Sequence, residues 1–391
     1  MIAIAALTVR AAQGFACALA LAAGLTHGPA TAAEGCALAE PVCAARGAVY
    51  RIAAFDPVAS AVRIGPDTLV TARHAVADVA SVALEGANGA KFTATPIASA
   101  YGGDIQLLRA PGLPDGPVLA PAAAPIAAAA DIYTIGYDVG RRAVRVYAPG
   151  KVTLPPAAGH PLARIHHDAH SQPGNSGGAL VDGQGRLVGI IASGGEGRFE
   201  AIPASAITAL RAASGPATES ESAEIGAAIR ICTVNLEALR ASRERRLADD
   251  KAKAIDTSCR RSRNRQLFDL AAQALGMRGR AAQSIALFDH ALAQDPNAIN
   301  SRIGLVVSLT LAGRQEDAVG HIRWLMDRGI DDVQVLRLGI QAGVWGGDKA
   351  LAERALARLK VVNPRMAPTA ERFLANPPPR PKPRPQIQKS P

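Results

Sequence analysis

The chain has 391 residues, 49% of them hydrophobic, which is enough apolar surface to bury two or three domain cores. No internal apolar run reaches the roughly 18 residues of a membrane-spanning helix, so we expect no internal membrane span. The formal net charge is +10, but residues 34–215 carry 14 basic and 14 acidic side chains, so the excess charge lies in the C-terminal half.

The N-terminal segment has the order of features of a secretory signal peptide. Arg10 precedes a small apolar stretch, residues 14–25, and small residues follow it. We expect cleavage after Ala32 or Ala33, which makes residues 1–33 the signal peptide and the mature protein periplasmic or secreted. An uncleaved membrane anchor is the alternative.

Cysteine usage agrees with export. Removal of the signal leaves four cysteines: Cys36, Cys43, Cys232 and Cys259. An even count in an oxidising compartment indicates two disulfides. The local pairs, Cys36 with Cys43 and Cys232 with Cys259, need the shortest loop closures and are favoured over the other two pairings. Free buried thiols are the alternative.

The first half of the mature chain is predicted to be all-β. Short apolar runs separated by Gly, Pro, Asp and Asn recur from about residue 48 to 209, for example at 68–70, 105–108 and 187–191. Frequent short strands between turn residues are typical of a barrel or a sandwich. We therefore predict a β domain over residues 34–215.

The second half is predicted to be all-α, because long stretches without Pro are rich in Ala, Leu, Arg and Glu. Residues 216–264 are interpreted as a charged helical linker, since 240–265 hold 10 basic and 4 acidic side chains. Residues 376–391 alternate Pro with Arg and Lys and should be an extended, disordered tail. These charges lack interleaved aromatics, so we expect no specific nucleic-acid binding; binding to a membrane surface is possible but has no support.

A 34-residue period divides residues 265–375. Glycines recur at Gly279, Gly313 and Gly347, and each precedes a small residue by five positions: Ser284, Ala318 and Ala352. A helix–turn–helix unit of this length resembles the tetratricopeptide repeat, which implies a concave surface for a peptide or a protein partner. The second unit departs from the family pattern, because Ile330 stands where the terminal proline is usual. An ordinary helical bundle is the alternative.

Three segments of the β half together indicate nucleophilic catalysis. They contain His74 directly after an apolar strand, Asp104 before the run Ile-Gln-Leu-Leu, and Ser176 within Gly-Asn-Ser-Gly-Gly. A serine hydroxyl becomes a good nucleophile when an imidazole takes its proton and a carboxylate orients that imidazole. We therefore assign Ser176 as nucleophile, His74 as general base and Asp104 as the orienting acid. The oxyanion hole is assigned to Gly174, Asn175 and Ser176, where the N–H groups of the first and the third converge.

With these motifs in this order, residues 47–210 resemble the trypsin-like peptidases, and most closely their bacterial HtrA (DegP-type) branch. The resemblance implies an all-β double barrel and a serine endopeptidase without metal or cofactor. The HtrA branch carries a PDZ domain after the peptidase, where this chain has helical repeats. Asn175 replaces the Asp that pairs with a new N-terminus in trypsin-type zymogens, so we expect no activation by N-terminal cleavage.

In this fold the primary substrate pocket lies before the nucleophile and on a later strand. The corresponding residues are His170, Ser171, Ile191, Ala192, Ser193 and Gly194. A polar or acidic side chain and a small apolar one both remain open as the preferred substrate residue. His166, His167 and His170 lack a neighbouring acidic or cysteine set, so no metal site is expected.

Two functions follow from these features. The first is an exported serine endopeptidase that acts on a peptide or protein substrate and recruits it, or a partner protein, through the helical repeats. The second is a catalytically silent scaffold that binds proteins through the repeats. Because the repeats supply no residue of the triad, catalysis and recognition should be separable, and a fragment ending near Gly215 should fold and hydrolyse small substrates.

Overall fold

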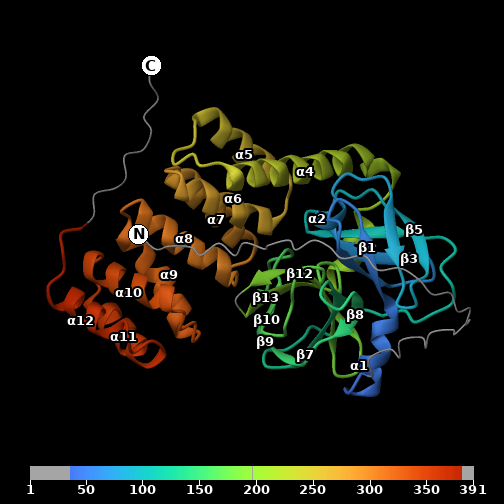
Figure 1. Cartoon of the computed structure of the whole chain (residues 1–391), viewed down its shortest axis with the longest axis horizontal. Helices are drawn as coiled ribbons and strands as arrows, with labels where there is room; N and C mark the ends of the chain where they lie inside the picture. Colours follow the sequence, from blue (N-terminus) through green and yellow to red (C-terminus); the bar gives the residue numbers. More distant parts are fainter. Residues whose placement is uncertain (1–35, 196, 381–391) are drawn as a thin grey trace, which may run out of the picture. The chain divides into compact units, whose positions relative to one another are not determined.

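The computed structural model describes residues 36–195 and 197–380. The predicted signal peptide and most of the predicted C-terminal tail lie outside this range. Figure 1 shows strands in the blue and green half of the chain and helices from yellow to red, so the predicted order of an all-β half before an all-α half is confirmed.

Six antiparallel strands form a first, closed barrel in the order β1-β2-β3-β6-β5-β4. Their bounds are β1 Val49–Ala53, β2 Ala59–Arg63, β3 Thr68–Ala72, β4 Val82–Glu85, β5 Lys91–Pro96 and β6 Ile105–Arg109. The interior holds aliphatic side chains such as Ile52, Leu69 and Leu108, each with no exposed surface. Burial of these side chains closes the barrel, since hydrophobic burial is the main favourable term in folding.

A second barrel contains β7, β9, β10, β13, β12 and β11, and the pairing of β11 with β7 closes it. The bounds are β7 Asp131–Asp138, β9 Gly150–Leu154, β10 Ile165–His167, β11 Ala179–Asp182, β12 Leu187–Gly195 and β13 Arg198–Pro203. A further strand, β8 Ala143–Val146, pairs with β7. One apolar cluster joins residues of both barrels, among them Val62 and Val70 of the first and Ile135 and Ile190 of the second. The two barrels therefore share a packed seam.

Helical hairpins with the predicted period follow the barrels. The first two pairs are α6 Arg265–Met277 with α7 Ala281–Gln294, and α8 Ile299–Leu311 with α9 Gln315–Asp327. The third pair is α10 Val333–Trp345 with α11 Lys349–Val362, and α12 Ala367–Ala375 follows it. Each of the three periodic glycines turns the chain with a positive φ of 74–83°. Ser284, Ala318 and Ala352 have no exposed surface, because a helix packs closely against each.

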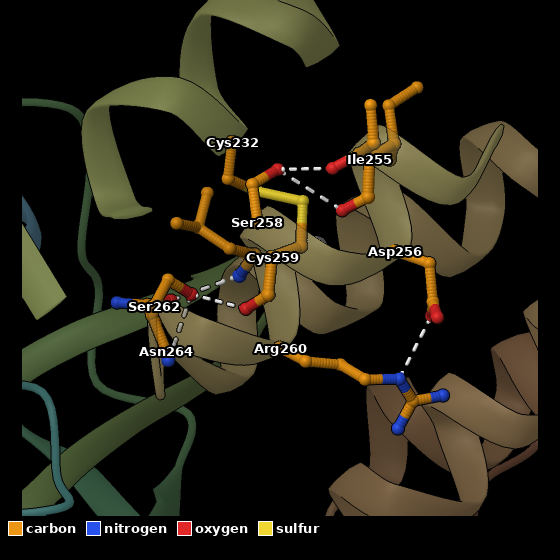
Figure 2. The surroundings of a disulfide bond; sticks show 10 residues. Cys232, Ile255, Asp256, Ser258, Cys259, Arg260, Ser262 and Asn264 are labelled. Carbon is orange, nitrogen blue, oxygen red and sulfur yellow. Dashed lines mark hydrogen bonds and ion pairs between the residues drawn. A yellow bond between two sulfur atoms is a disulfide. The ribbon is translucent and has the colours of Figure 1, made fainter. Parts of the chain in front are cut away.

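The segment 216–264 is not the exposed linker that its charge predicts. It forms α4 Glu219–Ala241 and α5 Asp249–Arg261, and both bury an apolar face in the same core as the hairpins. A disulfide joins Cys232 of α4 to Cys259 of α5, with a Cα–Cα distance of 4.9 Å (Figure 2). Closing this loop stabilises the fold by roughly 3–4 kcal/mol in the chain-entropy model. The predicted Cys232–Cys259 pair is therefore confirmed, and Cys36 and Cys43 are also disulfide-bonded.

Helix α4 packs directly on the first barrel next to α2, the short helix Arg73–Val76. At Gly226 an added Cβ would lie 2.5 Å from the carbonyl oxygen of Ala77, so only glycine allows this approach. Arg230 of α4 donates to both carboxylate oxygens of Asp78, at 2.7 and 3.0 Å from its Nε. The helical half is thus attached to the barrel by close packing.

The second barrel is also joined to the helical half. At the β12–β13 hairpin, Arg198 donates to Asn300 at 3.0 Å and to Asp332 at 3.3 Å. Two short helices complete the barrel half, α1 Glu40–Ala45 and α3 Ala206–Ala212. Among the described residues, no helix is long and apolar enough to span a membrane.

Candidate active site

His74 and Asp104 are brought together by the pairing of β3 with β6. In this register Ala72 lies opposite Ile105, so the residues just beyond the two strand ends are neighbours. The backbone N–H of His74 donates to Oδ1 of Asp104 at 2.9 Å, and Nδ1 of His74 lies 2.8 Å from Oδ2. Because an ionised carboxylate only accepts, Nδ1 carries the proton and Nε2 is left as the basic nitrogen.

Burial and charge act in opposite directions on this pair. Burial raises the pKa of Asp104, but the charge and hydrogen bonds of His74, together with the charge of Arg164, hold it below its ordinary value. Burial lowers the pKa of His74, whereas the charge and hydrogen bond of Asp104 outweigh it and raise the pKa. The arrangement therefore stabilises an imidazolium beside a carboxylate, as general base catalysis requires.

The loop that carries Ser176 is held by tight turns. The N–H of Asn175 donates to the carbonyl of Gln172 at 3.0 Å, and Gly174 has φ 97° at the third position of this turn. A type II turn requires that positive φ. At Gly177 an added Cβ would lie 2.2 Å from Ser60 O and from Thr71 Oγ1. The glycines that flank Ser176 are therefore needed where the loop meets the first barrel.

Ser60 of β2 connects the first barrel to this loop. Its Oγ donates to Gly174 O at 2.7 Å and accepts from the N–H of Tyr137 at 2.8 Å. Its own N–H donates to Ser176 O at 2.8 Å. Sequence reasoning missed Ser60, because a small polar residue in a strand gives no sign of contacts with residues 77–116 positions away.

Asn175 is completely buried, and this corrects its assignment to the oxyanion hole. Its N–H closes the turn, its Nδ2 donates to Tyr137 O at 3.0 Å and to Tyr147 Oη at 3.3 Å, and its Oδ1 accepts from Gln172 N at 2.9 Å. The side chain uses both donor and acceptor atoms to hold the loop. The described contacts at this position therefore require a neutral amide.

We expect Asn175→Asp to lower kcat by ~10²-fold, since a misplaced loop loses oxyanion donors. An ionised Asp cannot donate to Tyr137 O, so a buried negative charge would face that carbonyl oxygen. The matched control is Asn88→Asp, because exposed Asn88 only accepts a bond from Ala90 N, which a carboxylate also accepts. Steady-state kinetics with a chromogenic peptide measure both variants; equal kcat in both would contradict the role of the amide.

His74 and Ser176 line one groove of about 820 Å³. Five of the six predicted pocket residues line it: Ser171, Ile191, Ala192, Ser193 and Gly194. The sixth, His170, instead lies against the ring of Tyr147, at 5.1 Å between centroids, and against Phe199 at 6.2 Å.

The opposite wall of the groove comes from the helical half. Helices α4 and α6, with the residue before α6, supply Thr233, Val234, Glu237, Asn264, Gln266, Leu267 and Leu270. Sequence reasoning did not find this wall, because only tertiary packing brings these helices to the barrels. Both halves of the chain line the groove. This does not agree with the expectation that one half carries out catalysis and the other recognition.

His166 and His167 are both buried, and their rings have different surroundings. His166 Nε2 lies 3.0 Å from Oδ2 of Asp295, which belongs to the loop between α7 and α8. Burial, with the neighbouring His166, lowers the pKa of His167 to about 4, so this ring is neutral at physiological pH. Within the described ranges, no group of three or more His, Cys, Asp or Glu side chains is arranged to hold a metal ion.

Comparison with known proteins finds a family match within the barrel half. Residues 59–190 match the family model of the trypsin-like peptidase domain, and this match includes His74, Asp104 and Ser176. A search of curated proteins finds no match. The match ends within β12, so the tetratricopeptide resemblance of residues 265–375 stays a prediction.

Solved structures of similar proteins include the Rv3671c protease of M. tuberculosis. Its inactive form is 24% identical with a TM-score of 0.39, over 45% of this chain and 93% of that one. Its active form is 23% identical with a TM-score of 0.37, over 45% and 84%. The HtrA-type protease AlgW with tripeptide is 25% identical with a TM-score of 0.39, over 44% and 62%.

Proposed function

We propose that this chain, which contains a trypsin-like peptidase domain over residues 59–190, is a serine endopeptidase. The observation that carries the proposal is the hydrogen bond of 2.8 Å between His74 Nδ1 and Asp104 Oδ2, on the same groove as Ser176. A domain of this family with a base, an orienting acid and a serine in their family order supports peptide hydrolysis.

In the proposed reaction, His74 Nε2 takes the proton of Ser176 while Oγ attacks the scissile carbonyl carbon. The imidazolium is stabilised by Asp104 and then gives its proton to the leaving amine, which leaves an acyl-enzyme. Water, deprotonated by the same nitrogen, attacks the ester, and the imidazolium then returns the proton to Ser176 Oγ as the acid leaves. The N–H groups of Gly174 and Ser176 donate to the oxyanion in both steps, and each such donor lowers the barrier by about 2.7–4 kcal/mol.

Substrate binding involves both halves of the chain. Of the two preferences that the sequence leaves open, the small apolar residue has support, because Ile191 and Ala192 line the groove while His170 packs on Tyr147. Val234, Leu267 and Leu270 on the helical wall favour an extended peptide with apolar side chains. The helical half thus takes part in substrate recognition at the groove itself.

We also propose export to the periplasm or the medium. The disulfide between Cys232 and Cys259 supports it, since such bonds persist in oxidising compartments. The rival function, a silent scaffold, keeps the fold but needs no reactive serine, so a test of serine reactivity separates the two.

A fluorophosphonate probe tests the proposal on purified protein. We expect covalent labelling of the wild type and complete loss of labelling in Ser176→Ala, because only a serine activated by a base attacks the probe at a useful rate. Ser205→Ala is the matched control, since Ser205 is exposed and lies outside the groove, and it should label like the wild type. Labelling that survives in Ser176→Ala, or that fails in the wild type, would remove Ser176 from this role.

A further inference from the structure

Five titratable side chains form a buried cluster between the second barrel and the helical half. Arg164, His166 and Glu200 come from the barrel, and Arg265 and Asp295 come from the helices. Their side chains are at most 5% exposed. We call this set the ionic cluster. A buried charge is tolerated when it is paired and hydrogen-bonded, so these five side chains depend on one another.

Arg164 connects the ionic cluster to the candidate active site. Its Nη2 lies 3.8 Å from Oδ2 of Asp104, the same oxygen that faces His74. Its Nη1 donates to Ser193 Oγ at 2.7 Å and to Glu200 Oε2 at 3.1 Å. The guanidinium therefore lies between the carboxylate of Asp104 and that of Glu200.

The helical half holds the other side of the ionic cluster. Arg265, the first residue of α6, donates from Nη2 to Glu200 Oε2, and its Nη1 lies 3.4 Å from Asp295 Oδ2. Asp295 Oδ2 also accepts from the backbone N–H of Arg164 at 3.1 Å. Asp295 thus holds the backbone of Arg164, and Arg265 shares the carboxylate of Glu200 with the side chain of Arg164.

We propose that Arg265 and Asp295 position Arg164 beside Asp104, so that the helical half sets the electrostatics of the triad. The proposal rests on the proposed function, because it concerns the same His74 and Asp104. Arg164, Arg265 and Asp295 are positioning residues: they act through Asp104 and touch neither substrate nor the reacting atoms.

Charge balance explains the arrangement. The cations Arg164 and Arg265 face the anions Glu200 and Asp295, with His166 and Asp269 beside them, and Asp104 faces the imidazolium of His74. Without Arg265, Arg164 would face an excess of negative charge on the side away from Asp104. The guanidinium would then shift toward Glu200, since an unmatched buried carboxylate attracts the nearest cation most strongly.

The charged groups around His74 determine the direction in which the pH dependence of catalysis should shift. These are Asp104 and Asp56, which favour its protonation, and Arg164, which opposes it; the charge of Arg73 also interacts with Asp104. His74 accepts a proton only when neutral, so kcat/KM rises with pH through the pKa of His74. Loss or withdrawal of the Arg164 cation raises that pKa and moves this acid limb to higher pH.

The test is the pH profile of kcat/KM for the full-length protein on one chromogenic peptide. For Arg164→Met we expect the acid limb to move up by about one pH unit. For Arg265→Met we expect a shift of roughly half a unit in the same direction. Arg265→Lys keeps the charge, so its acid limb should lie close to that of the wild type.

A matched control separates this effect from general loosening of the two halves. Arg230→Met also removes an arginine that joins helix to barrel, but its partner is exposed Asp78, outside the ionic cluster. It should leave the acid limb in place. Thermal melting selects variants that fold. Arg265→Gln removes the charge but keeps a hydrogen-bond donor for Glu200, so it keeps the test possible if Arg265→Met unfolds.

The failures of the two proposals are distinguishable. If the wild type does not react with the fluorophosphonate, the proposed function fails. If it reacts, but folded Arg164→Met and Arg265→Met keep the wild-type acid limb, the positioning role fails. A uniform loss of rate at all pH values, with the limb unmoved, would assign the ionic cluster a structural role alone and overturn the inference.

Discussion

Asp104→Asn should lower kcat by ~10⁴-fold while the protein remains folded. An asparagine keeps the shape of the buried side chain, but it can present its amide N–H to His74 Nδ1. The ring then takes the wrong tautomer, with its proton on Nε2, and cannot accept the proton of Ser176. His74→Ala should cost a comparable amount, because residues that act as one unit are strongly non-additive.

The measurement is single-turnover kinetics on an activated peptide ester, with thermal melting to verify the fold. Asp168→Asn is the matched control: Asp168 is exposed, and its Oδ1 accepts from Lys151 N at 2.5 Å, which an amide oxygen also does. We expect wild-type rates for this control. A loss of less than tenfold in Asp104→Asn would show that Asp104 does not orient the base.

A fragment of residues 34–215 should lose nearly all peptidase activity, although it contains His74, Asp104 and Ser176. This expectation reverses the one drawn from the sequence, and the reason is the packing of the two halves. The fragment lacks Arg265 and Asp295 of the ionic cluster, so Arg164 loses the partners that hold it near Asp104. It also lacks the helical wall of the groove.

Truncation also exposes apolar surface on the barrels. Phe55, Ala77 and Leu154 pack against the core of the helical half, and solvent would reach them in the fragment. Each fully buried side chain of Leu or Phe size stabilises the fold by about 1.5–3 kcal/mol, a sizeable part of a marginal total. We therefore expect a lower melting temperature as well as a lower rate.

The control for truncation is a chain ending at residue 380, which keeps both walls of the groove and the ionic cluster. It should match the full-length protein in kcat/KM. Adding residues 216–380 in trans to the fragment should restore part of the activity. A fragment with full-length kcat/KM and an unchanged acid limb would show that the halves are separable after all.

The sequence alone predicted a structural feature correctly when the residues that determine the feature lie within one short segment. The short apolar runs predict the strands, and the periodic glycines at 279, 313 and 347 predict the turns between paired helices, because each needs a positive φ. The pairing of Cys232 with Cys259 follows from the short loop between them. The charge of residues 216–264 led to the wrong prediction of an exposed linker. One face of α4 and α5 is apolar and buried, while the charged side chains cover the other face.

The sequence by itself determined the order of the two halves, the strand and helix periods, and the motifs around His74, Asp104 and Ser176. Only the tertiary structure decided what surrounds those motifs: Ser60 beneath the serine loop, Arg164 beside Asp104, and α4 and α6 along the groove. The physical reason is that the motifs are local, whereas a buried charged residue such as Arg164 depends on partners far away in the chain: Glu200 is 36 positions away and Asp295 is 131. Such partners leave no periodic or local mark, and they become neighbours only when the helical half packs against the barrels.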